Sequence, residues 1–393
     1  MESSRSFPST ESRRNVAVLI DPGDSWGRRV ILAVSAAVRH LLPWDLLIAP
    51  QDDQWRHRIP QNWHGDGIIT EVRDEKTAQH VRSLDLPTIH TSYCDNTRDS
   101  RYRVITDDRK RAEMAFHHFL ERGFQNYAYY GPCNQRYPES RGEIFRDVVV
   151  AAGYECDVFQ HSGTQRNPDA VRIRATHWLK QLARPVAIFA GDPHPALQLT
   201  QICQAAGIHI PEDVAVLAGD SDDVLCDIAD PPLSSILLAC EQIGAQSVNM
   251  LQSIFQGKSP EHPHLLVPPM RVLVRQSTDI LAVKDEFFSQ ALRFIRENAH
   301  HGIQVTDILR HVPISRRGLE QRFLRYLNRS PADEIRKVRL ERVKYLLVAT
   351  DQSNEQIAIA SGFSSSSQMG VVFRKMLGMT PMDFRKANRR RDQ

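Results

Sequence analysis

The sequence predicts a two-lobed α/β domain followed by an all-α domain with two helix-turn-helix units. In residues 14–278, short apolar runs alternate with helical patterns of about 10–15 residues, which is typical of parallel sheets covered by helices on both faces. These units are too numerous for one sheet, so we expect two lobes. From residue 288 onward every pattern is helical, and the charge of the chain changes sign near the same point.

The C-terminal residues form a basic end on a mildly acidic body. Residues 284–393 contain 21 Lys and Arg against 12 Asp and Glu, a net charge of +9. The rest of the 393-residue chain contains 29 against 35, a net charge of −6. This asymmetry is typical of a polyanion-binding module attached to another domain. At this point an Arg-rich helical surface that is merely solvated remains the alternative.

The composition is that of a globular intracellular protein. Hydrophobic residues make up 41% of the sequence, which is enough for a core, and no run of about 18 apolar residues predicts a membrane span. Residues 1–13 are polar, lack the apolar middle of a secretory signal, and are predicted to be a disordered tail. The six cysteines lie far apart without a C-x-x-C pair. We therefore expect reduced thiols, no metal site, no cofactor and a cytoplasmic location.

The elements of the N-terminal domain follow one another as strand and helix. Strands are predicted at residues 15–21, 44–50, 65–70, 86–92, 126–131, 185–192 and 214–220. Helices are predicted at residues 28–42, 141–153 and 194–207. Another segment begins as a strand at Val104 and continues as a helix to Gly123. A linker at residues 279–287 then leads into the helical domain, residues 288–390.

The first helix-turn-helix unit is predicted in residues 302–331. An apolar stripe marks its first helix, residues 312–314 break it, and Ser315 stands at the N-cap of the second helix, residues 316–327. In that helix Leu319 and Phe323 point inward, which leaves polar side chains outside. A major-groove helix needs this combination of an apolar back and a polar front. The candidate DNA-binding residues here are Ser315, Arg316, Arg317, Glu320, Gln321 and Arg325.

The second unit is predicted in residues 354–381 and contains four consecutive serines. A serine run usually indicates a flexible linker, but Gly362 provides a turn and Ser364 or Ser365 can cap the following helix. The remaining serines can contact phosphates or bases near the helix start. The long helix at 332–350 can hold both reading helices about one DNA turn apart, roughly 34 Å. The candidate DNA-binding residues here are Ser364, Ser365, Ser366, Ser367, Gln368, Arg374 and Lys375.

These C-terminal motifs resemble the signature of AraC-type transcription regulators, over about a hundred residues. The resemblance implies a double helix-turn-helix domain that binds double-stranded DNA at tandem half-sites. The motif residues are Ile357-Ala358, Gly362-Phe363, Phe373-Arg374-Lys375, Gly378, Thr380-Pro381 and Phe384-Arg385.

In the N-terminal domain, four predicted strands end in carboxylates. Because ligands of doubly wound proteins bind at the carboxyl ends of the strands, Asp21, Asp107, Asp192 and Asp220 become candidate ligand contacts. For any one of them, a helix N-cap is the alternative. Carboxylates with an arginine and an aromatic ring suit a sugar. The carboxylates accept hydrogen bonds from the sugar hydroxyls, the arginine donates to them, and the ring packs on the C–H face. Trp26 and Arg141 are the candidates for those two roles.

Residues 23–27, GDSWG, match the nucleophile elbow of α/β-hydrolases. An enzyme of that class would use Ser25 as its nucleophile. However, the elbow belongs in the middle of a sheet, whereas this one follows the first strand with only a polar tail before it. A loop that needs small residues explains the pattern better, so we expect no catalytic residue.

Residues 14–278 also resemble the LacI-type, periplasmic-binding-protein-like fold. The stretches that carry this resemblance include DGIIT, IFAGD, VAVLAGDSDD and LLVPPMRVLVRQST. A LacI-type body joined to an AraC-type tail is the arrangement of the xylose-operon activator family. The resemblance implies a sugar-responsive activator with D-xylose or a related pentose as the effector. We expect it to act as a homodimer and to contact RNA polymerase. The sugar site it implies comprises Asp21, Trp26, Arg141, Asp192 and Asp220.

Overall fold

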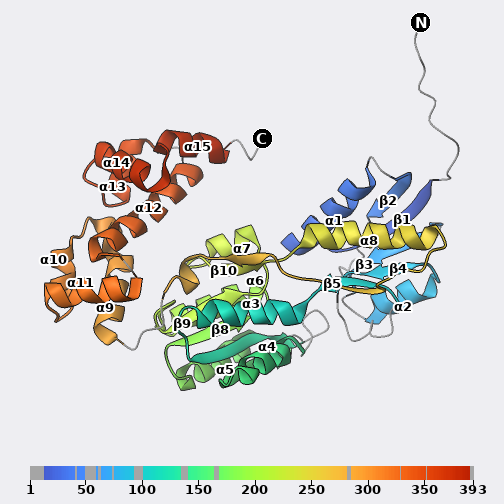
Figure 1. Cartoon of the computed structure of the whole chain (residues 1–393), viewed down its shortest axis with the longest axis horizontal. Helices are drawn as coiled ribbons and strands as arrows, with labels where there is room; N and C mark the ends of the chain where they lie inside the picture. The colour runs from blue at the N-terminus through green and yellow to red at the C-terminus, as the bar shows by residue number, and fades with distance from the viewer. Residues whose placement is uncertain are drawn as a thin grey trace, which may run out of the picture. The chain divides into compact units, whose positions relative to one another are not determined.

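Figure 1 presents the chain as a computed structural model. It divides into two compact units, Met1–Ile280 and Leu281–Gln393, and each is described by itself. The expected disordered tail lies almost wholly outside the described residues, as does the middle of the expected linker. The structure describes residues 13–39, 42–48, 59–60, 63–72, 75–92, 101–133, 140–162, 168–280, 285–327, 329–350 and 352–389.

The first unit contains two six-stranded sheets, one in each lobe. The first sheet has the order β11-β5-β4-β3-β1-β2, with every pairing parallel. The second has the order β12-β10-β9-β8-β6-β7, in which only β12 runs antiparallel to its neighbour. The strands of the first sheet are β1 (Arg14–Leu19), β2 (Trp44–Ile48), β3 (Gly67–Thr70), β4 (Thr88–His90), β5 (Arg103–Thr106) and β11 (His264–Val267). Those of the second are β6 (Asn126–Cys133), β7 (Cys156–Ser162), β8 (Val186–Ala190), β9 (Val214–Ala218), β10 (Ser234–Leu237) and β12 (Arg271–Leu273).

Helices cover both faces of these sheets, so the central strands are buried along their whole length. Strands β3, β8 and β9 have no exposed residue, which explains why they read as unbroken apolar runs rather than as an alternating pattern. The predicted two-lobed α/β fold is confirmed. The helices are α1 (Ser25–Val38), α2 (Glu75–Ser83), α3 (Asp108–Leu120), α4 (Ser140–Ala151), α5 (Pro168–Gln181), α6 (Pro193–Ala205), α7 (Asp223–Ile228), α8 (Cys240–Phe255) and the short 3₁₀ helix η2 (Gln276–Thr278).

The chain passes repeatedly between the lobes, and one of these crossovers lies between β10 and α8. Strand β10 belongs to the second sheet, whereas α8 lies along α1 on the first lobe (Figure 1). The two helices approach closely at Gly244, where a Cβ atom would lie 2.6 Å from the Cβ of Ala33. Leu238 and Ala239 therefore connect the two lobes.

The second unit is entirely helical in the residues that the structure describes, which confirms the predicted all-α domain. Its C-terminal half has a core in which Leu340, Val343 and Leu347 of the long helix α12 pack against α13 and α14. Helix α12 thus supports the second helix-turn-helix unit directly. The helices are α9 (Glu286–Asn298), η3 (Ala299–His301), α10 (Val305–His311), α11 (Arg316–Leu327), α12 (Pro331–Ala349), α13 (Asn354–Ala360), α14 (Ser366–Leu377) and α15 (Pro381–Arg389).

The serine run opens helix α14, as the sequence indicates. Ser365 is the N-cap, and its hydroxyl accepts a hydrogen bond from the Gln368 backbone N–H at 3.2 Å. The preceding turn depends on Gly362, whose φ of 82° lies in the left-handed region. A Cβ there would meet the carbonyl oxygen of Ala299 at 2.4 Å, so glycine is required for both conformation and space.

Candidate functional site

A cavity of about 80 Å³ lies between the two lobes of the first unit, at the carboxyl ends of the strands. The first lobe contributes the start of α1 and the residues that follow β3 and β4. The second lobe contributes the starts of α4, α6 and α7, together with the start of α3, which packs against α4 and β12. This is where doubly wound folds place their ligands. The wall residues used below are Asp24, Ser25, Trp26, Glu71, Ser92, Asp108, Arg111, Arg141, Asp192, His194, Asp220 and Asp222.

Four of the five residues expected at the sugar site line this cavity, and Asp21 does not. Trp26, Arg141, Asp192 and Asp220 come together from separate elements. Asp21 lies in the loop between β1 and α1, where its carboxylate accepts a hydrogen bond from the Gly23 backbone N–H at 2.7 Å. This local bond turns the side chain into its own loop, as aspartates in turns commonly do.

The strand-end carboxylates divide into those that cap helices and those that do not. Asp107 caps α3 by accepting from the Lys110 N–H at 3.0 Å, and Asp222 caps α7 by accepting from the Leu225 N–H at 2.9 Å. Asp192 stands at the N-cap of α6 without making a side-chain cap bond, and Asp220 heads no helix. The helix-cap alternative therefore holds for Asp107, whereas Asp192 and Asp220 face the cavity without that role.

Two arginines, the buried Arg111 and the half-buried Arg141, form a charge cluster with aspartates in the cavity wall. Arg111, whose side chain is 3% exposed, forms an ion pair with Asp108 at 2.6 Å. Arg141 lies 3.7 Å from Asp108 and 3.8 Å from Asp192. Burial is the main cause that lowers the pKa of Arg111, and nearby Arg141 acts in the same direction. Such a cluster fixes the orientation of each donor before any ligand arrives.

The cavity wall also holds polar atoms without a hydrogen-bond partner in the described part of the chain. These are the buried hydroxyl oxygen of Ser92 and the Nε of Arg111. Because buried polar groups in native proteins are nearly always hydrogen-bonded, these atoms indicate that the cavity accommodates a polar ligand or water.

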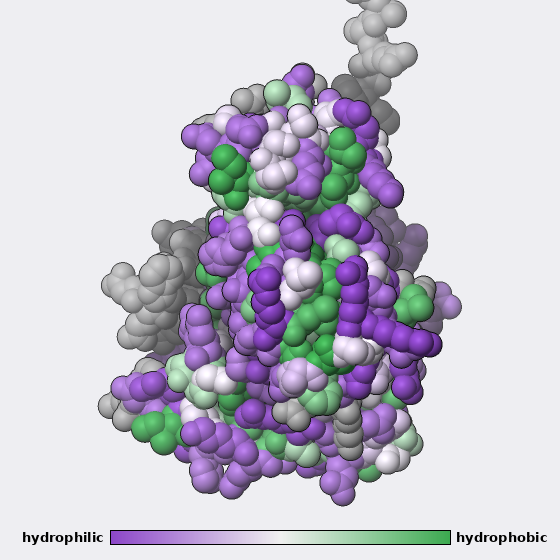
Figure 2. All heavy atoms as spheres, turned by 90° about the vertical axis from the view of Figure 1, so that its left-hand side faces the viewer, coloured by the Kyte–Doolittle hydropathy of each residue, from purple (hydrophilic) through white to green (hydrophobic). Residues whose placement is uncertain are grey.

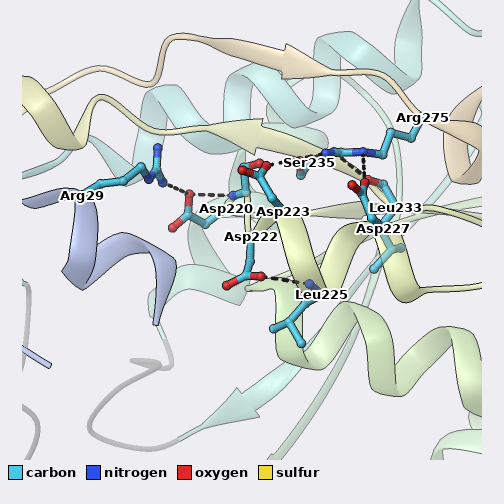
Figure 3. Close-up of polar contacts among 10 residues, drawn as sticks. Arg29, Asp220, Asp222, Asp223, Leu225, Asp227, Leu233, Ser235 and Arg275 are labelled. Atoms are coloured by element: carbon cyan, nitrogen blue, oxygen red, sulfur yellow. Dashed lines mark hydrogen bonds and ion pairs between the residues drawn. The ribbon is translucent and has the colours of Figure 1, made fainter. Parts of the chain in front are cut away.

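Asp220 is the most perturbed carboxylate of the cavity. Burial, reinforced by nearby Asp192, raises its pKa to about 7, while Arg29 opposes this rise. The Arg29 guanidinium lies 3.1 Å from Asp220 Oδ1, and the Ser221 backbone N–H donates to the same oxygen at 2.6 Å (Figure 3). Asp220 is thus held in place from both lobes.

Sequence reasoning missed Arg111 and Arg29. Arg111 left a signal, because it occupies the stripe of α3 that is otherwise buried with Ala112, Ala115 and Phe116. A basic residue in an apolar stripe indicates a buried ion pair or a ligand contact. Arg29 left no such signal, since its partner lies 191 residues away.

Ser25 lines the cavity as the first residue of α1, but its environment is not that of a nucleophile. Among the described residues no hydrogen bond joins its hydroxyl to a histidine, although His194 lies in the same cavity wall. An activated serine needs such a base within hydrogen-bond reach.

In the second unit, helix α11 exposes the expected polar face. Its side chains are outside except for the inward-facing Leu319 and Phe323 and a few half-buried positions. Ser315 accepts from the Gly318 N–H at 3.1 Å, so its hydroxyl caps the helix. Arg316 is paired with Glu320 at 3.1 Å. The exposed residues of this face are Ser315, Arg316, Arg317, Glu320, Gln321, Leu324 and Arg325.

Helix α14 presents a smaller polar front. The hydroxyl and backbone N–H of Ser364 both donate to Gln368 Oε1 at 3.0 Å, which occupies that oxygen of the side chain. The Ser366 N–H donates to Glu355. The outward side chains of α14 include Ser367, Arg374, Lys375 and the 69%-exposed Val371. Figure 2 shows the side of the molecule on which Figure 1 labels α10 and α11. Most side chains on this side are hydrophilic, with smaller apolar patches between them.

Two kinds of feature are absent from the described residues. They contain no group of three or more His, Cys, Asp and Glu side chains placed to hold a metal ion. Their helices are also too short or too polar to cross a membrane.

Comparison with known proteins assigns both units. Residues 116–278 match a periplasmic binding protein-like domain, and residues 308–387 match a helix-turn-helix domain. The chain therefore has the domain composition of the transcription regulators that join a periplasmic-binding-protein-like domain to an AraC-type helix-turn-helix domain, as the sequence motifs predict.

Within that class, the chain is similar along its length to xylose operon regulatory proteins. It is 28% identical to that of Escherichia coli strain K12, over 96% of this chain and 98% of the other. It is also 28% identical to that of Haemophilus influenzae, over 96% and 99%. The solved structure of the xylose-binding transcription activator xylR matches with a TM-score of 0.78 at 27% identity, covering 96% of this chain and 99% of that one.

Proposed function

We propose that this chain is a transcription activator that responds to D-xylose or a related pentose bound in the cavity between the lobes. The sugar would favour one arrangement of the lobes and so shift the population of DNA-binding states. The observation that carries the proposal is the convergence of Trp26, Arg141, Asp192 and Asp220 on one cavity in a chain whose full-length relatives regulate a xylose operon.

The size of the cavity supports a monosaccharide. A buried water needs roughly 10–15 Å³ of such space, so about 80 Å³ corresponds to a handful of waters. One sugar ring can displace that number, whereas two linked rings need considerably more room.

The charge of the wall supports a neutral ligand. Its carboxylates outnumber its two arginines, Arg111 and Arg141, so a sugar phosphate or sugar acid would meet net repulsion. A neutral sugar instead donates its hydroxyls to the carboxylates and accepts from the guanidinium groups. Trp26 provides an apolar ring for the C–H face. The wall carboxylates are Asp24, Glu71, Asp108, Asp192, Asp220 and Asp222.

For the second unit we propose that α11 and α14 read tandem half-sites on double-stranded DNA. Support comes from the exposed Arg316, Arg317 and Gln321 on α11, and from Arg374 and Lys375 on α14. Guanidinium and amide groups can make bidentate contacts to base edges, while basic side chains toward the helix end suit phosphates. In α14 the self-paired Ser364 and Gln368 leave Ser367 as the more available polar group.

We also propose that the protein acts in the cytoplasm as a homodimer, contacts RNA polymerase and has no enzymatic role. Its helix-turn-helix domain supports the role in transcription. The location is supported by the described cysteines Cys156, Cys203, Cys226 and Cys240, because free thiols are typical of the cytoplasm. Turnover of an acyl ester that disappears in Ser25→Ala would overturn the non-enzymatic assignment.

Calorimetric titration of the full chain with D-xylose, other pentoses, hexoses and disaccharides tests the sugar assignment. We expect D-xylose or a related pentose to bind with one site, and disaccharides and sugar phosphates to give no heat. Asp220→Ala should abolish the binding while leaving the affinity for DNA without sugar unchanged. Binding of a disaccharide in preference to every monosaccharide would contradict the assignment.

A further inference from the structure

We propose that Arg29 is a positioning residue that fixes the orientation and charge of Asp220 for the ligand and joins it to both lobes. The inference rests on the proposed sugar-binding function of the cavity. Arg29 is not among the residues that line the cavity, so its effect on a ligand would pass through Asp220.

The side chain of Arg29 reaches from the first lobe to two points that belong to the second lobe and the crossover. It extends from α1, where its Nη2 lies 3.1 Å from Asp220 Oδ1. Its Nη1 donates to the carbonyl oxygen of Leu238 at 3.3 Å, in the connection between β10 and α8. One guanidinium group therefore contacts the inter-lobe connection and the strand-end carboxylate together, and Figure 3 shows the second of these contacts.

The contacts of Asp220 leave one of its oxygens for a ligand. Within the described part of the chain, Oδ1 accepts from both Arg29 and the Ser221 backbone N–H, whereas the structure assigns no hydrogen bond to Oδ2. The residue is buried and also belongs to the cavity wall. A carboxylate with one oxygen held by two donors is oriented before the ligand binds. Binding to the other oxygen therefore costs less side-chain entropy.

The surrounding charges make Asp220 depend on Arg29. Asp192, at the start of α6, favours the protonated carboxyl, and Cys240 at the start of α8 is a further titratable neighbour. Arg111 on α3 and Arg29 on α1 favour the carboxylate, with Arg29 the stronger of the two. Burial has already raised the pKa of Asp220 to about 7, so loss of Arg29 would leave the carboxyl mostly protonated at neutral pH.

This dependence distinguishes a positioning role from a merely structural one. If sugar hydroxyls donate to the Asp220 carboxylate, ligand affinity falls as the pH drops through the pKa of Asp220. Removing the positive charge at position 29 moves that midpoint to higher pH. A side chain that only stabilises the fold would lower the melting temperature without moving the midpoint.

The test is a calorimetric titration of the full chain with D-xylose at several values between about pH 5 and pH 9, a range that spans the expected midpoint. Arg29→Gln should bind at least about fivefold more weakly at pH 7 and have a raised midpoint, because a rise of one pKa unit from about 7 lowers the ionised fraction of Asp220 from about one half to about one eleventh. Arg29→Lys should recover most of the affinity and the original midpoint. Arg28→Gln is the matched control, because within the described residues the exposed Arg28 on the same helix donates only to loop carbonyls of Pro22 and Gly23.

Each outcome decides between the inference and the proposed function. An Arg29→Gln protein with the affinity and midpoint of the unaltered chain would overturn the inference alone, as would weaker binding with an unmoved midpoint. Failure of the unaltered chain to bind D-xylose or any other sugar would overturn the proposed function. In that case a double-mutant cycle of Arg29→Gln and Asp220→Asn decides the inference without ligand. The free energy of unfolding is measured for each variant at several pH values, and a coupling energy of zero between the two substitutions would overturn the inference.

Discussion

The cavity of the first unit and the reading helices of the second use the same residue types in opposite environments. In the cavity, the buried Arg111 forms an ion pair with the half-buried Asp108. On α11, Arg317 is exposed and makes no hydrogen bond or ion pair within the described residues. Buried charges shape a specific ligand site at a cost in desolvation, whereas exposed charges add little to stability and remain free for a partner. The two regions should therefore respond very differently to loss of an arginine.

The largest expected effect is on the stability of the first unit. Arg111→Ala removes a buried side chain and leaves the half-buried Asp108 without its nearest partner, so we expect the free energy of unfolding to fall by about 3–5 kcal/mol. Chemical denaturation measures this. Arg109→Ala is the control on the same helix, because its pair with Glu113 is exposed and contributes about 0.5 kcal/mol or less. Equal losses in the two variants would remove the contrast between buried and exposed charge.

The next effect is a pH dependence that originates at Asp220. The folded-state pKa of about 7 lies above the ordinary 3.8, so the folded protein holds this proton more tightly than the unfolded chain. The stability this contributes is fully present below about pH 4 and is lost as the pH rises through about 7. Relative to Asp220→Asn, the unaltered chain should lose up to about 4 kcal/mol over that range. Denaturation curves with a difference independent of pH would contradict the raised pKa.

A smaller effect is expected on DNA binding. Arg317→Ala should weaken binding to a specific duplex, selected from a random pool with the full chain, by about 1–3 kcal/mol. Lys375→Ala should weaken specific and random duplexes to a similar degree, because a phosphate contact carries no sequence information. Fluorescence anisotropy measures both. If Arg317→Ala weakens random duplex equally, Arg317 contacts phosphate rather than bases.

The smallest expected effect tests the serine run. Ser365→Ala removes the cap of α14 and should destabilise the second unit by about 1 kcal/mol. Ser367→Ala, at an exposed position without a capping bond, should change its stability by less than about 0.5 kcal/mol. Thermal denaturation of the two variants gives the comparison. Indistinguishable melting temperatures would mean that the run has no capping role.

The same contrast explains what the sequence could predict. In the helical unit, α11, α12 and the start of α14 were predictable, because caps, the Gly362 turn and inward apolar residues such as Phe373 are local features. The cavity was predictable in location and in four of its residues, because the carboxyl ends of parallel strands converge. Asp21 lies outside the cavity wall, where its carboxylate accepts a hydrogen bond from a backbone N–H two residues away. Arg29 could not be found, since only the folded chain brings it to Asp220.

The central claim is that a sugar in the cavity alters how the helical unit binds DNA. The most direct measurement is the dissociation constant of the full chain for a selected duplex, with and without saturating D-xylose, in the unaltered protein and in Asp220→Ala. We predict a change of about 5–150-fold in the unaltered protein, the usual range for coupled sites, and none in Asp220→Ala. The same dissociation constant with and without sugar, at concentrations that calorimetry shows to fill the cavity, would contradict the account.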